Sequence, residues 1–454
     1  MKNLMTSKSD PPSDVKIGIV GLGYVGLTTA VGFAHLGLNV TGTDSDPNRV
    51  ANLNEGIAYI NEPRLQDLLN EGLHSGRLRF HGSNESIIQN ADVVFVCVGT
   101  PQSKSGDPDL SQIDQAVISI GKNIRKYTVI VMKSTVPVGT SMRVHQTLSQ
   151  ICKDQSHFDV VSNPEFLREG FAIEDFLKPT RVVIGVDSLN ACKLLKDIYS
   201  HLGRPILITN SNTAEVIKHA SNSFLATKIS FINMISDLCE SSGADVYTVS
   251  EAMGMDPRIG PQYLSAGIGY GGSCLPKDIK ALIHSGNLHK VDMSILESVD
   301  RINKSRIENL VDKLEQVIGS LAGKKIAVLG LAFKPGTDDV RESPSLKTIQ
   351  TLLSRSSSVR LHDPIAIEAT KILIPEQPES VEYFSTVEEA VRGTEAQLVL
   401  TAWPEYQDYD LDFLKNLVKS TVLVDGTNMF DPKKVTESGF RYVSIGRMNP
   451  NPLS

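Results

Sequence analysis

The segment with the most reactive chemistry in this sequence is IGYGGSCLPKDIKALI, which contains Cys274. Pro276 stands where a helix would begin, because proline suits the first helical turn. Cys274 is therefore expected just before a helix N-terminus, where the helix dipole and the nearby Lys277 favour the thiolate. The sequence predicts a nucleophilic cysteine, which follows three glycines that form an extended, flexible approach: Gly269, Gly271 and Gly272.

Three polar side chains could assist this cysteine. Asp278 is expected in the first turn of the same helix, where it could orient the surroundings of the thiol, activate water, or act as an N-terminal capping charge. Lys218 and Asn222 are four residues apart in a long helical stretch and share one face of it. A cation beside an amide donor could stabilise an alkoxide or a tetrahedral oxyanion, although such a pair could also form part of a solvated stripe.

A further pair of carboxylates lies in SNPEFLREG, where Glu165 and Glu169 are also four residues apart. They could position sugar hydroxyls, the ribose of a nicotinamide nucleotide, or a catalytic water. Glutamates at this spacing are also common on helix surfaces, so the spacing by itself does not define a site.

A dinucleotide site is predicted near the N-terminus by VKIGIVGLGYVGL. Gly21, Gly23 and Gly26 form GxGxxG directly after a strand and at the start of a helix. In this pattern the first glycine allows the tight turn, the second admits the pyrophosphate, and the third lets helix and strand pack closely. The helix N-terminus offers N–H groups and a positive dipole to the phosphates.

The second strand ends at Asp44, close to the offset expected for an acid that binds the ribose hydroxyls. A carboxylate there repels a 2′-phosphate, which favours NAD over NADP, although Arg49 could offer some phosphate affinity. Further strands end in small hydroxyl residues, and ligands of open α/β sheets collect at the carboxyl ends of strands. Thr100, Ser134 and Thr135 are therefore candidates for the cofactor and substrate crevice, or else turn and cap residues.

The other cysteines and the composition exclude several classes of protein. Cys97, Cys152, Cys192 and Cys239 lie in apolar patterns and are expected to be inert. Five widely spaced cysteines without a CxxC pair indicate neither a disulfide framework nor a zinc site, and suit a reducing compartment. The histidines lack metal-ligand spacing, so no metal is expected. With 45 Lys and Arg against 52 Asp and Glu and no basic block, neither nucleic acid nor a membrane surface is an expected partner. A cytoplasmic location is expected.

The chain should divide into α/β domains joined by helices. Residues 14–210 alternate short apolar runs with helical patterns, as a parallel sheet requires, and 211–310 lose every strand signal. The α/β pattern returns over 311–454, where four further strands are expected in KKIAVLGL, SVRLHDP, AQLVLTAW and TVLVDGTN. Residues 1–13 are expected to form a disordered tail. The predicted fold class is α/β, with two Rossmann-like doubly wound domains joined by a central helical dimerisation segment. The strands expected in the first domain are Lys16–Val20, Asn39–Thr43, Val93–Val98, Val129–Lys133, Val160–Ser162 and Val182–Ile184.

An NAD site together with a poised cysteine predicts a particular chemistry. A carbon that is oxidised through an aldehyde would be held as a thiohemiacetal, lose hydride to form a thioester, and then be hydrolysed.

Several segments, in this order, resemble the UDP-glucose/GDP-mannose dehydrogenase family over nearly the whole chain: GLGYVG, VCVGTP, KSTVPVGT, SNPEFLREG, AEVIKHASNSFLATKISFIN, GYGGSCLPKD and FKPGTDDVRESPS. DPRIGPQYL, TAWPEY and VDGTNMFDP are similar to the branch that oxidises UDP-glucose, although the GDP-mannose branch shares GGSCLPKD. The resemblance implies oxidation of a nucleotide sugar to its uronate with reduction of NAD. GLAFKPG lacks GxGxxG, so the C-terminal domain is not expected to bind a second NAD, and the resemblance implies that it holds the nucleotide of UDP-glucose.

The resemblance also implies roles for individual residues. Cys274 would be the nucleophile, and Lys218 and Asn222 would stabilise negative oxygen. Asp278 would act with Lys218 and a water, and Glu169, near Thr135, would assist thioester hydrolysis. Arg258 would reach the substrate site of a neighbouring subunit, which implies a homodimer or higher oligomer. The positions that would contact cofactor also include Tyr24, Val25, Lys277 and Arg341, and those that would contact substrate include Glu165, Phe166, Leu167, Tyr263, Gly271 and Lys334.

Other functions stay open at this point. GDP-mannose or a UDP-N-acetylhexosamine could replace UDP-glucose. A two-electron β-hydroxyacid dehydrogenase would share the NAD domain and need a lysine but no cysteine. A nucleotide-sugar sensor would bind without turnover and would tolerate loss of both residues.

Overall fold

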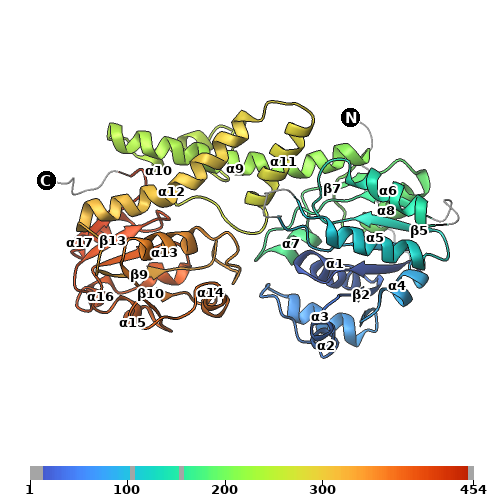
Figure 1. Ribbon diagram of the computed structural model, residues 1–454, viewed down its shortest axis with the longest axis horizontal. Helices are drawn as coiled ribbons and strands as arrows, with labels where there is room; N and C mark the ends of the chain where they lie inside the picture. Colours follow the sequence, from blue (N-terminus) through green and yellow to red (C-terminus); the bar gives the residue numbers. More distant parts are fainter. Residues whose placement is uncertain (1–13, 103–107, 153–157, 448–454) are drawn as a thin grey trace. The chain divides into compact units, whose positions relative to one another are not determined.

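The computed structural model of the chain describes residues 14–102, 108–152 and 158–447 (Figure 1). The expected tail, residues 1–13, lies outside the described residues. The chain forms two compact units, one of 1–221 with 280–289 and one of 222–279 with 290–454. Each unit is described by itself below. The domain boundaries expected at 210 and 310 stay predictions.

The first unit contains an eight-stranded sheet in the order β3-β2-β1-β4-β5-β6-β7-β8. All neighbouring strands pair in parallel except β6 and β7, which meet in an antiparallel register. The chain order reverses at β1, and such a switch point is where open α/β sheets place a ligand. The strands are β1 (Lys16–Val20), β2 (Asn39–Thr43), β3 (Leu78–His81), β4 (Val93–Val96), β5 (Thr128–Met132), β6 (Phe158–Ser162), β7 (Val182–Gly185) and β8 (Ile206–Thr209).

The six strands expected in this unit are all present. β3 and β8 were not predicted, because both are four-residue strands at the edges of the sheet. β3 alternates buried and exposed residues, so it lacks the continuous apolar run of an inner strand. β8 has a run of only three apolar residues and is at most half-buried. The helices of this unit are α1 (Tyr24–His35), α2 (Pro47–Asn54), α3 (Leu65–His74), α4 (Asn84–Asn90), α5 (Ser111–Asn123), α6 (Thr140–Ile151), α7 (Ala172–Leu177) and α8 (Leu189–Ser200).

The middle of the chain is helical, as expected. It contains α9 (Ser211–Ser242), α10 (Val246–Gly254), α11 (Leu275–Leu288) and α12 (Ser294–Ile318). Within the second unit α9 and α12 lie side by side and run in the same direction (Figure 1). Ser230 Oγ donates to the Val299 carbonyl, and the buried Arg306 pairs with Asp237 further along both helices.

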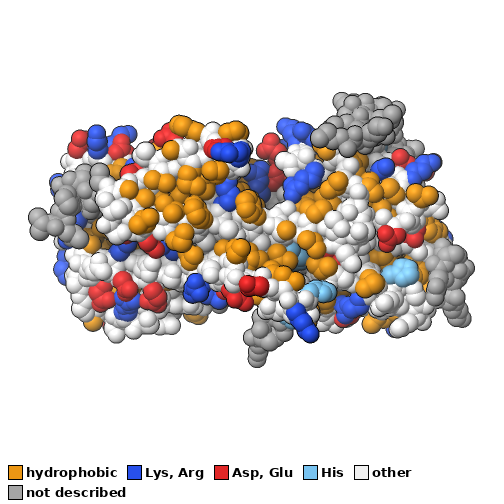
Figure 2. Space-filling view, turned by 90° about the horizontal axis from the view of Figure 1, so that it is seen from above, with side chains coloured by type: hydrophobic (Ala, Val, Ile, Leu, Met, Phe, Trp, Pro, Cys, Tyr) orange, Lys and Arg blue, Asp and Glu red, His pale blue; other side chains and the backbone are white. Residues whose placement is uncertain are grey.

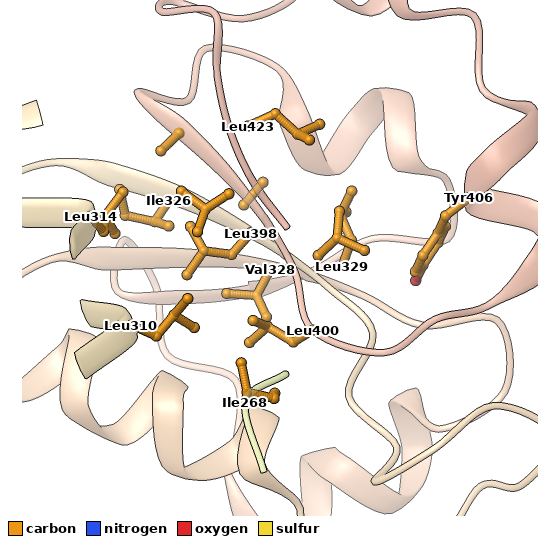
Figure 3. Close-up of a cluster of buried hydrophobic side chains, with 14 of the residues drawn as sticks. Ile268, Leu310, Leu314, Ile326, Val328, Leu329, Leu398, Leu400, Tyr406 and Leu423 are labelled. Atoms are coloured by element: carbon orange, nitrogen blue, oxygen red, sulfur yellow. The ribbon is translucent and has the colours of Figure 1, made fainter. Parts of the chain in front are cut away.

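The second unit contains a six-stranded parallel sheet in the order β11-β10-β9-β12-β13-β14, which is the strand order of a doubly wound dinucleotide-binding fold. The short edge strands β11 and β14 were not predicted. Leu310 and Leu314 of α12 pack against Ile326, Val328 and Leu398 of this sheet (Figure 3). The elements are β9 (Lys325–Leu329), α13 (Pro344–Ser354), β10 (Ser358–His362), α14 (Ile367–Leu373), β11 (Val381–Tyr383), α15 (Val387–Val391), β12 (Ala396–Val399), the 3₁₀ helix η2 (Pro404–Asp408), α16 (Leu411–Leu414), β13 (Val422–Asp425), α17 (Pro432–Glu437) and β14 (Arg441–Val443).

The turn after the first strand has the same construction in both sheets. Gly21 and Gly330 have φ of 90° and 95°, a region that favours glycine. The next residue donates its backbone N–H to the aspartate that follows the second strand: Leu22 to Asp44 and Leu331 to Asp363, both at 2.7 Å. The two sheets therefore share one turn geometry although their sequences there differ.

The second turn is closed by an aromatic side chain. The indole N–H of Trp403 donates to Asp363 Oδ2 at 3.0 Å, and the backbone N–H of Ala332 donates to the same oxygen. Asp363 is buried, and Trp403 is too. In a dinucleotide site this aspartate would bind a ribose, but here it is buried and its carboxylate is bonded to protein groups. This supports the expectation that the domain holds no second NAD.

No helix in the described ranges is both long and apolar enough to cross a membrane.

Candidate active site

The glycine loop has the geometry that the motif predicts. Gly21 turns the chain after β1, and α1 begins at Tyr24. A Cβ at Gly26 would lie 1.8 Å from the Gly21 carbonyl oxygen, so this glycine is required for packing. A Cβ at Gly23 would meet nothing within 4 Å. Gly23 therefore faces open space at a helix N-terminus, which fits a pyrophosphate.

Asp44 follows β2 and braces this loop through Leu22. Its Oδ2 also accepts from Arg49 Nη1 at 3.1 Å, and Oδ1 accepts from the backbone N–H of Asp46. A carboxylate oxygen can accept two hydrogen bonds, so Oδ1 retains acceptor capacity for a ribose hydroxyl. The guanidinium of Arg49 lies 4.7 Å from the ring centre of Tyr59. Arg49 thus pairs with the acid and an aromatic ring, and its predicted contact with cofactor stays a prediction.

Tyr24 has a partner that sequence reasoning missed. Its hydroxyl bonds to the carboxylate of Glu62, which is buried and also accepts from the backbone N–H groups of Gly170 and Ala172 at 2.8 and 2.6 Å. Burial, followed by the Glu62 contact, raises the pKa of Tyr24. Glu62 therefore joins the first turn of α1 to the loop that carries Glu169. Glu62 has no motif around it, so the sequence contained no signal for this role.

The strand-end hydroxyls lie together, as the sheet topology requires. Thr100 Oγ1 donates to the Thr135 carbonyl at 2.9 Å, which links the loops after β4 and β5. Ser134 is buried and donates its hydroxyl to the Val98 carbonyl at 2.6 Å. This bond is the turn role that was the alternative for Ser134, while Thr135 is partly exposed on the same loop.

The segment with Glu165 and Glu169 is a loop after β6, so the two glutamates do not share a helix face. Glu165 is 5% exposed, and its Oε1 accepts from Lys218 Nζ of α9 at 2.9 Å. Lys218 is itself 3% exposed, which rules out the solvated stripe. The neighbouring Phe166 ring lies 5.5 Å from the ammonium group. The first unit thus contains a buried lysine–glutamate pair.

Cys274 lies where the sequence placed it, directly before α11. The first helical hydrogen bond runs from the Asp278 N–H to the Cys274 carbonyl at 2.9 Å. The thiol is partly exposed and lies 3.5 Å from Ser273 Oγ. A thiol at a helix N-terminus has the positive dipole end beside it, which favours the thiolate.

Asp278 is fully buried and is held from two sides. Asn222 Nδ2 of α9 donates to Oδ2 at 2.6 Å, and Lys277 Nζ pairs with Oδ1 at 2.6 Å. A buried carboxylate needs such partners, because burial of an isolated charge is costly. Lys277, expected near the thiol and at the cofactor, is an ion-pair partner of Asp278 in this unit. Asn222 is buried as well and retains a second amide hydrogen.

The glycines before the cysteine are tightly packed, so the expected flexible approach was wrong. A Cβ at Gly271 would lie 2.3 Å from the Glu342 carbonyl oxygen, and one at Gly272 would lie 2.6 Å from the Phe333 ring. The Gly272 N–H donates to the Arg341 carbonyl. These glycines let the cysteine loop lie directly on the segment after β9.

Asn303 of α12 fixes the same loop. Its Oδ1 accepts from the Tyr270 N–H at 2.8 Å and its Nδ2 donates to the Tyr270 carbonyl at 3.0 Å. Gly269, with φ of 100°, leaves room for this side chain. Asn303 gave no sequence signal, because it lies 33 residues away and acts only through the fold.

Four further predicted residues, Arg258, Tyr263, Lys334 and Arg341, lie on loops of the second unit. Arg258 is exposed and its guanidinium is oriented by Asp256, with Nε 3.0 Å from Oδ1. Tyr263 has φ of 64°, which is uncommon for a bulky residue and is typical of functional segments. Arg341 forms a similar pair with Asp339. Lys334 lies 5.4 Å from the Phe333 ring centre.

The other cysteines differ from Cys274 in their surroundings. Cys97 and Cys239 are buried, and burial raises the pKa of Cys97 to about 12. Cys152 and Cys192 are partly buried. None of these five cysteines forms a disulfide in the described part of the chain. Within the described ranges, no group of three His, Cys, Asp or Glu side chains is arranged to bind a metal ion.

Three domain models of one family match the chain. Residues 15–203 match the NAD binding domain, 212–305 the central domain and 327–432 the UDP binding domain of the UDP-glucose/GDP-mannose dehydrogenase family. The UDP-glucose 6-dehydrogenase TuaD of Bacillus subtilis is 43% identical over 95% of this chain and 93% of its own length.

Solved structures agree. A UDP-glucose dehydrogenase from Pyrobaculum islandicum has a TM-score of 0.89 and 40% identity over 94% of this chain and 97% of its own. A UDP-D-ManNAc dehydrogenase from Pyrococcus horikoshii has a TM-score of 0.85 and 30% identity over 96% and 100%.

Proposed function

Because the chain belongs to the UDP-glucose/GDP-mannose dehydrogenase family, we propose that it oxidises the C6 alcohol of UDP-glucose to UDP-glucuronate with NAD. The observation that carries this proposal is Cys274 at the N-terminus of α11, with the buried Asp278 one turn into the same helix. A two-electron alcohol dehydrogenase has no use for a nucleophilic thiol. A four-electron oxidation needs one, to hold the aldehyde.

The cofactor is NAD, as the family assignment of residues 15–203 states. The residues that fit it are the turn at Gly21, the open face at Gly23 and the ribose acceptor Asp44. When bound, NAD supplies the hydride acceptor for both oxidations. UDP-glucose as substrate is supported by the 43% identity to a UDP-glucose 6-dehydrogenase.

The chain's own groups provide the remaining chemistry. The alcohol loses a proton and a hydride and becomes an aldehyde. The Cys274 sulfur adds to its carbonyl carbon, the oxygen takes up a proton, and a thiohemiacetal forms. Loss of the second hydride together with the hydroxyl proton converts this to a thioester. Water adds at the thioester carbon, the C–S bond breaks, and the carboxylate leaves with the thiol restored. The ammonium of Lys218 and the second amide hydrogen of Asn222 are suited to stabilise the negative oxygen of these steps.

Two carboxylates are candidates for the proton transfers. Asp278 is held by Asn222 and Lys277, so its position is fixed, and a fixed acceptor near the thiol can orient water. Glu169 lies beside Gly170, whose N–H is bound by Glu62. We assign water activation to Asp278 and thioester hydrolysis to both groups.

The test is oxidation of UDP-glucose by the purified chain with NAD. About two NADH are expected per sugar, with UDP-glucuronate as product and little free aldehyde. Formation of one NADH with release of an aldehyde would refute the covalent mechanism. If no nucleotide sugar gives NADH, the remaining function is that of a sensor that binds without turnover. GDP-mannose and N-acetylated UDP-sugars in parallel reactions decide the substrate.

The second unit has an apolar face that supports a homodimer. Phe224, Phe231 and Leu238 are seven residues apart along α9 and are 65%, 41% and 60% exposed. Hydrophobic side chains gather on the face that carries α9 (Figure 2). Exposed apolar patches of this kind mark protein interfaces. We propose that two copies pair through α9 and that Arg258, oriented by Asp256, reaches the substrate of the partner.

Five free thiols suit a reducing compartment, so we propose that the enzyme acts in the cytoplasm.

A further inference from the structure

A second buried lysine lies next to the predicted active-site pair. Lys133 directly follows β5 and is 5% exposed. Its Nζ donates to Asn163 Oδ1 at 3.1 Å and lies 3.4 Å from both the Asn163 carbonyl and the Tyr199 hydroxyl. Burial of an ammonium group is costly unless its hydrogens are used, and here each has an acceptor.

Asn163 connects this lysine to the loop after β6. Its backbone N–H donates to the Met132 carbonyl and its Nδ2 to the Val183 carbonyl, so Asn163, directly after β6, is bonded to both β5 and β7. The Tyr199 hydroxyl donates to the same Oδ1 at 2.5 Å. Two residues further along the loop is Glu165, the partner of Lys218.

The charges around Lys133 indicate an electrostatic role for it in addition to packing. Four titratable groups face it: the Cys97 thiol at the end of β4, the Tyr199 hydroxyl on α8, the Glu165 carboxylate and the Lys218 ammonium of α9. Burial lowers the pKa of Lys133 to about 8. Glu165 opposes this shift, and Lys218 adds to it by repulsion. Cys97 is a neutral thiol at that pH, because burial raises its pKa to about 12.

We propose that Lys133 is a positioning residue for the Glu165–Lys218 pair. The ammonium of Lys133 fixes the Asn163–Glu165 loop, and its charge repels that of Lys218. This inference rests on the proposed function. Glu165 is bordered by two lysines in a buried site, so the loss of one cation changes both the place of the carboxylate and the balance between the charges. The hydroxyl of Tyr199 supports the same Asn163 atom without a charge.

The Lys133→Met variant separates charge from packing, because Met fills similar volume and cannot donate. We expect kcat to fall by on the order of 10-fold, since small displacements of catalytic groups are costly. The loss should be largest below pH 8, where wild type carries the charge, and should shrink as pH rises through about 8, where wild type loses it. Lys196→Met on the exposed side of α8 is the control for surface charge and should leave kcat unchanged.

Tyr199→Phe is the matched control within the network. It removes the hydrogen bond to Asn163 Oδ1 and one acceptor of the Lys133 ammonium, and it removes no charge. Its ratio of wild-type to variant kcat is expected to be flat with pH. A flat ratio for Lys133→Met as well would overturn the role of the charge, and unchanged kcat in Lys133→Met would overturn the inference altogether.

If Lys133→Met does not fold, Asn163→Ala tests the positioning step. That variant keeps the ammonium and removes its side-chain acceptor Oδ1, so kcat should fall, and normal kcat would refute the inference. The assays also separate the two proposals. Absence of NADH formation by wild type with every nucleotide sugar refutes the proposed function and with it this role. Turnover by wild type with equal kcat in the variant refutes only the role of Lys133.

Discussion

The side-chain amide of Asn222 on α9 donates to the carboxylate of Asp278 on α11 across 2.6 Å. This bond links the helix behind Cys274 to the long central helix, and both side chains are buried. Because Lys277 occupies the other carboxylate oxygen, Asp278 can neither rotate nor exchange its partners freely. The carboxylate one turn from the thiol is therefore held in one orientation before any substrate arrives.

Asp278→Asn tests this arrangement. In this variant Lys277 loses its counter-charge, and the new amide lies against the amide of Asn222. We therefore expect kcat for UDP-glucuronate formation to fall by about 100-fold or more. The exposed Asp338→Asn makes the same chemical change in the same unit and should have no effect. Steady-state NADH formation measures both, and equal activity in the two variants would exclude Asp278 from the chemistry.

Cys274→Ala removes the nucleophile. We expect no net formation of uronate, because the aldehyde can no longer be held for the second oxidation. Product analysis by mass spectrometry measures this outcome. Cys192→Ala, on α8, is the matched control and should retain normal turnover. Near-normal turnover in Cys274→Ala would instead identify a two-electron dehydrogenase.

Glycine-to-alanine variants of the first loop should separate folding from cofactor binding. Gly26→Ala places a Cβ 1.8 Å from a carbonyl oxygen and should cost about 1–3 kcal/mol of stability. Gly23→Ala meets nothing within 4 Å, so its melting temperature should match wild type while NAD affinity falls by on the order of 10-fold. Thermal unfolding and calorimetric titration measure the two effects, and unchanged NAD affinity in Gly23→Ala would contradict the predicted pyrophosphate site.

The dimer predicts complementation between inactive variants. Arg258→Ala and Cys274→Ala should each be inactive alone, because one lacks the arginine given to the partner and the other lacks the nucleophile. Unfolding and refolding them as a mixture should restore turnover, since a mixed dimer contains one complete site. Failure to regain activity, with dimers present by analytical ultracentrifugation, would show that Arg258 acts within its own subunit.

His362 should make the second unit sensitive to acid. Burial lowers the pKa of His362 from its ordinary 6.5, and its Nδ1 lies 3.0 Å from the Tyr406 hydroxyl. The unfolded chain therefore binds more protons than the folded chain as pH falls through that value, so stability present above about pH 6.5 is lost below it. His362→Gln should flatten the dependence of melting temperature on pH, and the exposed His74→Gln should not.

Local patterns predicted what depends on neighbours along the chain. The glycine turn before α1 and the helix start after Cys274 are determined within a few residues, so the sequence located both. The inner strands of both sheets were found because they are buried on both faces. The edge strands were not, since short half-exposed segments lack that pattern.

Pairings between distant segments could not be predicted in the same way. Glu165 and Lys218 are 53 residues apart, and Glu62 acts on a backbone N–H 108 residues away. The resemblance named Glu165 and Lys218 but did not pair them with each other. Lys133 begins the KSTVPVGT motif, but neither that motif nor the sequence around Asn303 shows which strands and loops the fold brings to these side chains.

The matched turns of the two sheets change how mutations of Asp44 should be interpreted. In the second sheet Asp363 makes the same bond to the turn although Trp403 closes that position. An aspartate at this position therefore stabilises the turn whether or not a nucleotide binds. If replacing Asp44 lowers the affinity for NAD, two causes act together: the turn loses the bond that holds it, and the ribose loses its acceptor. The two halves of the chain are thus alike in this aspartate, although only the first carries GxGxxG at the turn.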